Sequence, residues 1–292
     1  MPESSMPLQA ALQLLLNPWG LAVLGLCIGS FLNVVIHRLP KMLDAQWRAD
    51  AQAVLHPDDA VEETDGISLS KPASRCPHCG HQIRWFENIP LLSWLVLRGK
   101  CSSCSARISV RYPLIELATG ALFALCGLHF GEQPSTLLWC GFVAVLVAAA
   151  AIDWDTTLLP DDLTLPLLWA GLVGAGLGWL PLPLHDALWG AVAGYLSLWS
   201  VYWLFKLTTG KEGMGYGDFK LLAALGAWLG WQMILPVVLA SSLIGAVIGI
   251  GMKVTGNLRE GVYVPFGPFL AGAGLVVALA GQQTVMGWLG WA

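Results

Sequence analysis

The chain has 292 residues, of which 56% are hydrophobic and only 12% are charged, and its mean hydropathy is +0.65. This composition carries more apolar surface than a water-soluble globule can bury, so it excludes an ordinary soluble domain and indicates a membrane protein. The net charge of -4 is small and gives no support for a nucleic-acid partner.

Apolar runs recur along the chain, bounded by proline, glycine or charge, and about eight of them approach the roughly 20 residues that a helix needs to cross a bilayer. We expect spans over 18–36, 112–128, 135–152, 163–179, 187–205, 219–231, 235–252 and 265–280. The run 219–231 is short and interrupted by glycine, as in helices that are re-entrant or buried among others. The prediction is an all-α polytopic membrane protein.

The N-terminus has neither the basic residues nor the cleavage site of a signal peptide, so we expect the first span to be retained. Residues 8–16 before it have the composition of an interfacial helix. The predicted organisation is an N-terminal segment (1–17), a first transmembrane helix (18–38), a soluble domain (39–111) and a membrane domain (112–292). The soluble domain includes an acidic stretch, 56–66, that is expected to be a solvated loop.

Basic residues are distributed unevenly, since ten of the fifteen Lys and Arg residues lie between Arg38 and Arg111. The positive-inside rule then places the soluble domain in the cytoplasm and the N-terminus on the opposite side of the membrane. With eight spans, the connections 129–134 and 180–186, which contain no Lys or Arg, lie outside as the rule requires.

Four cysteines form two CxxC pairs, Cys76 with Cys79 and Cys101 with Cys104. This spacing is typical of a zinc ribbon, in which two tight turns each present two thiolates to a tetrahedral ion. Disulfides and a redox CxxC are the alternatives, but a cytoplasmic location disfavours disulfides. Four thiolates leave no open position for water, so the zinc is expected to be structural. His78 and His81 are close enough to be substitute ligands.

Two carboxylates lie at predicted cytoplasmic ends of spans: Asp153 follows an apolar run, and Asp218 follows the glycine-rich run 213–217. Ionisable groups at membrane depth are functional candidates. Two neighbouring carboxylates can share a proton, so that one acts as base on water and the other as acid. Gly215 and Gly217 would let a substrate backbone approach Asp218 closely.

The neighbouring carboxylates Asp155, Asp161 and Asp162 are alternative candidates. Asp161 and Asp162 precede an apolar run and are most simply helix N-caps, whereas Asp155 fits a solvated loop. Spacing alone does not decide among them.

Several motifs resemble the type IV prepilin leader peptidase family of GxGD aspartyl peptidases. They are GSFLNVVIHRLP at 29–40, the paired CxxC motifs followed by RYPLIELATG at 111–120, IDWDTTLLPDDLTLPLLW at 152–169, and GKEGMGYGDFK at 210–220. Together they span nearly the whole chain.

The resemblance implies about eight membrane helices, a cytoplasmic zinc-binding domain, and catalysis by Asp153 and Asp218 in the bacterial inner membrane. It also implies substrates that are prepilins and pseudopilins of type IV pili and type II secretion, cut after a glycine between a short basic leader and a hydrophobic helix.

The resemblance further implies that the enzyme can methylate the new N-terminus with S-adenosylmethionine. No glycine fingerprint marks a site for this donor; Asn33 and Glu116 are the candidates, with helix–helix hydrogen bonding or capping as the alternative roles. A leader peptidase without methyltransferase activity, a zinc-regulated transporter and a structural assembly factor remain alternative functions.

Overall fold

The computed structural model describes residues 12–56, 66–255 and 264–291, which are mainly helical and contain no β-strand. Most of the acidic stretch 56–66 and the first residues of the interfacial segment 8–16 lie outside these ranges, although residues 12–16 are helical. Contacts within the chain divide it into two compact units, Met1–Glu132 and Gln133–Ala292. Each unit is described by itself.

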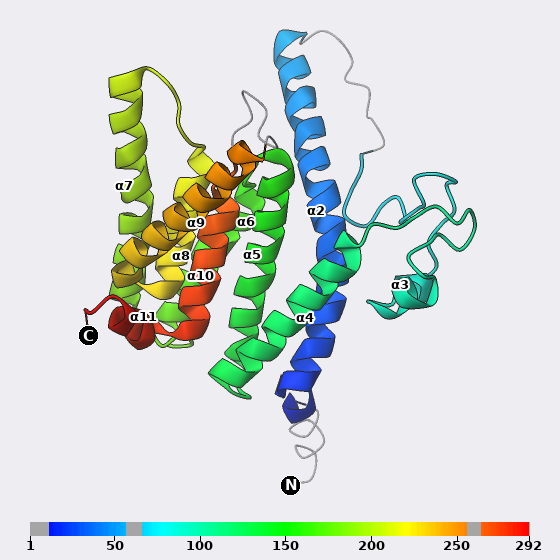
Figure 1. Ribbon diagram of the computed structural model, residues 1–292, viewed down its shortest axis with the longest axis horizontal. Helices are drawn as coiled ribbons and strands as arrows, with labels where there is room; N and C mark the ends of the chain where they lie inside the picture. The colour runs from blue at the N-terminus through cyan, green and yellow to red at the C-terminus, as the bar shows by residue number, and fades with distance from the viewer. Residues whose placement is uncertain (1–11, 57–65, 256–263, 292) are drawn as a thin grey trace. The chain divides into compact units, whose positions relative to one another are not determined.

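The first unit is built on two long helices that run side by side, α2 (Pro18–Leu55) and α4 (Arg111–Phe130) (Figure 1). Helix α2 begins at the predicted residue because the Asn17 side chain accepts a hydrogen bond from the Gly20 N–H at 2.8 Å and Pro18 occupies the first turn. The helix continues through Pro40, well beyond the predicted end of the first transmembrane segment at residue 38.

Glycines allow α2 and α4 to approach closely. A Cβ atom on Gly25 would lie 2.8 Å from the Cα of Gly120, and one on Gly29 would lie 2.7 Å from the Cα of Glu116. Such small-residue contacts are a common basis of helix association in membranes. They explain why α4, which the sequence suggests belongs with the later spans, lies in one compact unit with α2.

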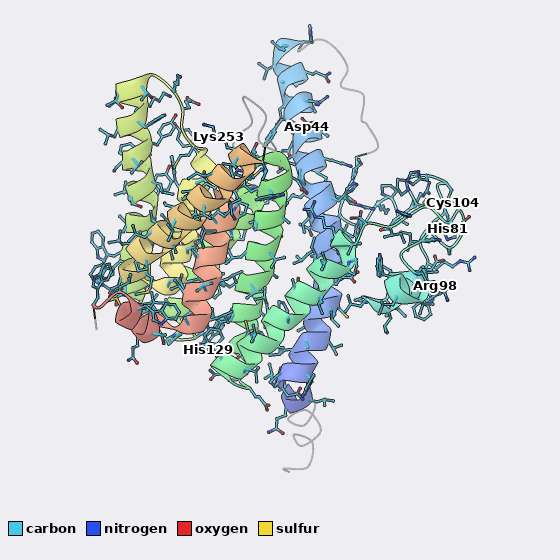
Figure 2. All side chains as sticks on the ribbon, viewed as in Figure 1. Asp44, His81, Arg98, Cys104, His129 and Lys253 are labelled. Carbon is cyan, nitrogen blue, oxygen red and sulfur yellow. The ribbon has the colours of Figure 1, made fainter. Side chains whose placement is uncertain are left out.

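The segment between α2 and α4 contains a 3₁₀ helix, η1 (Trp85–Asn88), and a short helix, α3 (Leu92–Val96). It also contains two similar turns, each closed by an isolated antiparallel bridge, Arg75 to Gln82 and Lys100 to Arg107. Figure 2 shows His81, Arg98 and Cys104 together on this segment. The predicted zinc ribbon therefore consists of these two turns, residues 75–82 and 100–107, here called knuckles, which are joined by η1 and α3.

The second unit is a bundle of helices (Figure 1). Its longer helices are α5 (Thr136–Thr156), α6 (Asp161–Gly176), α7 (Leu184–Thr209), α8 (Tyr216–Leu229), α9 (Ile234–Val254) and α10 (Gly267–Ala280). Two short elements, η2 (Trp231–Met233) and α11 (Gln282–Trp288), precede α9 and follow α10.

Helix α8 forms the core of this second unit. All its residues from Asp218 to Leu229 except Lys220 are buried. Gly190 of α7 packs directly against Gly226, and Gly171 of α6 leaves room for the Trp228 ring, whose Nε1 donates to the Leu167 carbonyl at 2.8 Å. The short, glycine-containing run predicted at 219–231 is thus buried among other helices.

All eight predicted spans coincide with helices, but they differ in length. Five described helices are long and apolar enough to cross a membrane, and the pair α10 and α11, bent by 107°, would make six. Helices α6 and α8 have only 16 and 14 residues, because glycines with positive φ, Gly178 after α6 and Gly230 after α8, end each helix before its apolar sequence ends. The chain is a multi-span membrane protein.

Candidate active site and metal centre

A cavity of about 510 Å³ in the second unit is lined by both Asp153 and Asp218. The two carboxylates come from different helices, the last turn of α5 and the first turn of α8, and are only 4% and 6% exposed. The pair predicted from the sequence is therefore brought into one cavity.

The Asp153 carboxylate is held by the start of α10. The backbone N–H of Gly267 donates to Asp153 Oδ2 at 2.9 Å, and a Cβ atom on Gly267 would lie 2.6 Å from the same oxygen. A helix N-terminus favours a negative charge beside it. This contact was not predicted from the sequence, although PFGP at 265–268 is a recognisable helix start.

The glycines before Asp218 have different surroundings. Both Gly215, which caps α8, and Gly217 line the cavity. A Cβ atom on Gly217 would lie 2.6 Å from the Cβ of Leu159, whereas one on Gly215 would have no atom closer than 4.0 Å. Gly217 is needed for packing against Leu159, and only Gly215 has open space on the side where a Cβ would project.

The alternative aspartates do not line this cavity. Asp155, Asp161 and Asp162 are all exposed. Asp161 and Asp162 are not the N-cap of α6, since Pro160 occupies that position and both aspartates lie in the first turn. The helix therefore begins at Asp161, two residues before the predicted start of this span at residue 163. Asp161 instead pairs with Lys220, with oxygen–nitrogen distances of 2.6 and 2.7 Å.

A third carboxylate, Glu212, also lines the cavity and was missed from the sequence. Its Oε1 accepts a hydrogen bond from Lys206 Nζ at 2.8 Å, and this bond lowers the pKa of the Glu212 carboxyl below its usual range. Lys206 in turn donates to the hydroxyl of buried Tyr202 at 3.1 Å. The loop before α8 is thereby tied to α7.

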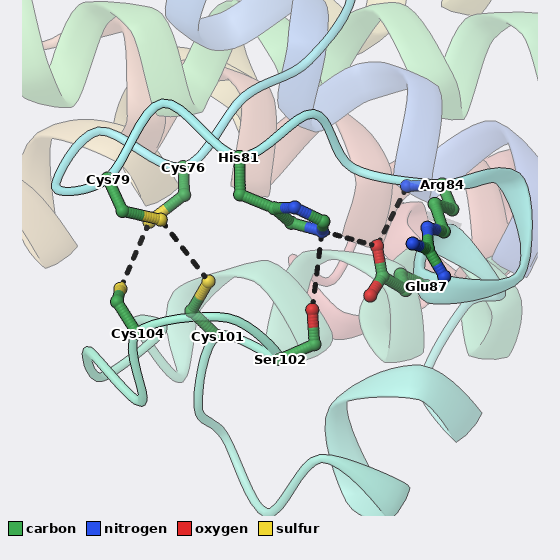
Figure 3. A network of polar contacts seen from close by, with 8 residues as sticks. All are labelled: Cys76, Cys79, His81, Arg84, Glu87, Cys101, Ser102 and Cys104. Atoms are coloured by element: carbon green, nitrogen blue, oxygen red, sulfur yellow. Dashed lines mark hydrogen bonds and ion pairs between the residues drawn. The ribbon is translucent and has the colours of Figure 1, made fainter.

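The four predicted metal ligands form one cluster in the first unit, with all sulfur atoms within 4.8 Å of one another. Cys76 Sγ lies 3.8 Å from Cys104 Sγ, and Cys79 Sγ lies 4.0 Å from Cys101 Sγ (Figure 3). Sulfurs bound tetrahedrally at about 2.3 Å from a zinc ion lie about 3.8 Å apart. The two measured pairs are therefore at or close to the spacing that a tetrahedral zinc ion requires.

Backbone N–H groups in the knuckles favour the thiolate form of Cys76 and Cys101. Those of Cys79 and His78 lower the pKa of the Cys76 thiol to about 7, and those of Cys104 and Ser103 lower the pKa of Cys101. Among the described residues no other group of histidines, cysteines and carboxylates has metal-binding geometry. His78 and His81 do not belong to the cluster.

His81 instead belongs to a polar network that joins the two knuckles. Its Nε2 lies 3.2 Å from Glu87 Oε2 and 3.3 Å from Ser102 Oγ, and the same Glu87 oxygen accepts the N–H of Arg84 at 2.8 Å (Figure 3). The hydrogen bond from the Arg84 N–H, and to a smaller extent the one from the Ser102 side chain, lowers the pKa of the Glu87 carboxyl to about 2. This network was not predicted from the sequence.

Asn33 and Glu116 line a second cavity, of about 500 Å³, within the first unit. Asn33 Nδ2 on α2 donates to the Tyr112 carbonyl on α4 at 3.2 Å. This helix–helix hydrogen bond matches the alternative role predicted for Asn33. Glu116 Oε2 accepts the N–H of Leu91 at 2.8 Å. Both residues thus have structural partners and also face a cavity.

Two family models match the chain in succession, the Bacterial Peptidase A24 N-terminal domain over residues 23–130 and the Type IV leader peptidase family over residues 140–250. No solved structure gave a significant match.

Curated relatives match nearly the full length and are named prepilin leader peptidase/N-methyltransferase. The protein of Stutzerimonas stutzeri is 55% identical, covering 91% of this chain and 92% of its own. That of Aeromonas hydrophila is 55% identical, covering 88% and 89%, and that of Pseudomonas aeruginosa is 54% identical, covering 89% of each. The chain belongs to the prepilin leader peptidase/N-methyltransferase family.

Proposed function

We propose that this protein cleaves the leader from prepilins and pseudopilins by an aspartyl mechanism and then methylates the new N-terminus. The observation that carries the proteolytic part is the cavity in which Asp153 and Asp218, both buried, come together from different helices. The names of the relatives, at about half identity over nearly the full length, support both parts.

In the proposed cleavage, one carboxylate of the pair removes a proton from water, and the other, protonated, donates its proton to the scissile carbonyl oxygen. The hydroxide adds to the carbonyl carbon. The carbon–nitrogen bond then breaks, the amine leaves with the proton taken from water, and the hydroxyl returns its proton to the second carboxylate. The Gly267 N–H fixes the orientation of the Asp153 carboxylate during these steps.

We assign zinc to the four cysteines, where it would supply a structural cross-link between the knuckles, because four thiolates leave no position for a reacting water. The methyl donor is S-adenosylmethionine. The terminal amine nitrogen bonds to the methyl carbon, the carbon–sulfur bond breaks with its electron pair on sulfur, and the amine loses a proton.

We place the protein in the bacterial inner membrane with its N-terminus in the periplasm and both activities at the cytoplasmic face. The distribution of Lys and Arg supports this orientation. A leader kept in the cytoplasm is itself expected to be basic, so enzyme and scissile bond would meet at one depth.

The test is cleavage of a prepilin by the detergent-purified protein with S-adenosylmethionine present, followed by mass spectrometry of the product N-terminus. We expect wild type to give a cut, methylated product, and Asp153→Asn and Asp218→Asn to give no cut. Asp162→Asn is the matched control, because Asp162 is exposed and does not line the cavity.

Other outcomes identify the alternatives. A cut but unmethylated product would leave a leader peptidase alone. Ion flux in liposomes that is lost in Asp218→Asn, without any cut, would indicate a transporter. Pilus or secretion function retained by the double Asn variant would indicate an assembly factor.

A further inference from the structure

The cavity of the first unit has a composition that suits a specific small molecule. It lies between α2, the knuckles and α4, with the zinc ligands Cys76 and Cys101 in its wall, and its volume of about 500 Å³ includes the edge of the metal centre. All its lining residues belong to the first unit.

Glu116 supplies a buried carboxylate on one wall. The residue is 8% exposed, and it forms no ion pair with a basic side chain of the described residues. A carboxylate can accept about four hydrogen bonds, and the Leu91 N–H supplies only one. A buried carboxylate without a countercharge is costly unless donors or a cation satisfy it, so Glu116 is suited to ligand hydroxyls.

Trp94 on α3 supplies an aromatic surface to the same cavity. Its indole is oriented by a hydrogen bond from Nε1 to the Ile108 carbonyl at 3.4 Å. A fixed indole favours a flat heterocycle and also attracts a ligand cation.

Four further charged residues line the cavity, one glutamate and three arginines. Glu87 lines it as a second carboxylate, while Arg75 and Arg107 are exposed lining residues. The third lining arginine, Arg38, is occupied by the carbonyls of Ser68 and Pro72, each at 2.8 Å. The cavity thus combines an aromatic plane, acceptors for hydroxyls, negative charge and cationic groups.

We propose that this cavity binds the adenosyl sulfonium methyl donor, with Glu116 accepting hydrogen bonds from the ribose hydroxyls and Trp94 packing against the adenine. Carboxylates bind ribose hydroxyls in the same way in dinucleotide sites. The assignment rests on the methyl transfer proposed above, and it places the donor in a different unit from the aspartate pair.

The test is calorimetric titration of the zinc-loaded, full-length protein in detergent with S-adenosylmethionine and with S-adenosylhomocysteine. We expect Glu116→Gln and Trp94→Leu to raise both dissociation constants at least tenfold, about 1.4 kcal/mol each. Glu132→Gln, an exposed residue that does not line the cavity, should bind like wild type. Asp218→Asn should also bind like wild type although it cannot cut.

Zinc content and melting temperature show whether each variant is folded, and Gln at position 116 can still accept the Leu91 N–H. Ultraviolet cross-linking of radiolabelled donor to wild type gives a result independent of any variant. We expect the label in peptides from residues 85–116; label confined to 133–292 would overturn the assignment.

The outcomes separate this inference from the proposed function. If wild type binds and transfers methyl groups while Glu116→Gln and Trp94→Leu bind unchanged, the site is wrong and the function stands. If wild type neither binds the donor nor methylates the product, the proposed methyl transfer fails and this inference fails with it.

Discussion

The Gly267 N–H donates to Asp153 Oδ2 at 2.9 Å, although 114 residues separate them in the chain. The glycine is required sterically, since an added Cβ atom would lie 2.6 Å from the carboxylate oxygen and 3.2 Å from its carbon. The segment before α10 therefore determines where this carboxylate lies in the cavity.

Gly267→Ala should lower kcat/KM for leader cleavage about 100-fold, because the displaced carboxylate no longer reaches the water that it orients. The measurement is the initial rate of cleavage of a purified prepilin. Gly272→Ala is the matched control on the same helix, because its added Cβ would have no atom within 4 Å. Cleavage at the wild-type rate by Gly267→Ala would show that the contact is dispensable.

Gly217→Ala should destabilise the protein by about 1–3 kcal/mol, because overpacking against Leu159 forces the loop after α5 to move. Gly215→Ala should leave the melting temperature unchanged, because its Cβ projects into open space, yet it should raise KM if substrate backbone passes there. Thermal unfolding and cleavage kinetics on both variants separate the two roles. Equal melting temperatures would contradict the packing role of Gly217.

Lys220→Met should lower the free energy of unfolding by up to about 1 kcal/mol, the contribution of a partly exposed ion pair, as measured by thermal unfolding. The lost contact is the one between Lys220 and Asp161 at the start of α6. Lys220→Arg should retain the wild-type stability because a guanidinium also binds both carboxylate oxygens. Lys211→Met, in the loop before α8, is the control; an equal loss in that variant would point to a general effect of positive charge.

Removal of zinc should unfold the knuckles and leave the aspartate cavity formed, because the ligands and the aspartates belong to different units. Cys79→Ser should lower both the zinc content, measured by atomic absorption, and the melting temperature. Cys27→Ser, an exposed cysteine outside the cluster, should change neither. Full zinc content in Cys79→Ser would exclude this cysteine as a ligand.

The sequence was most informative where a local pattern carries the chemistry. The CxxC spacing predicts the metal ligands because each knuckle is closed by its own hydrogen bonds, Cys76 N–H to the His81 carbonyl and Cys101 N–H to the Ala106 carbonyl, both at 2.8 Å. The length of each apolar run likewise predicts a helix. Asp153 and Asp218 could be proposed because carboxylates are unusual beside apolar runs.

Contacts between distant segments could not be predicted in this way. Nothing in the local sequence of Gly267 indicates that it faces Asp153, and Lys220 and Asp161 are paired only because α6 and α8 pack together. Helix α2 extends to Leu55 because its polar second half still has a helix-forming sequence, which a search for apolar runs does not detect.

The burial of α8 limits where a substrate can be cut. Because α6, α7 and α10 cover the sides of α8, a hydrophobic substrate helix cannot lie along α8 within this unit. A substrate can reach Asp218 only through the cavity at the first turn of α8. The cut site is then set by where α8 begins, so lengthening the apolar stretch of a prepilin should not move it.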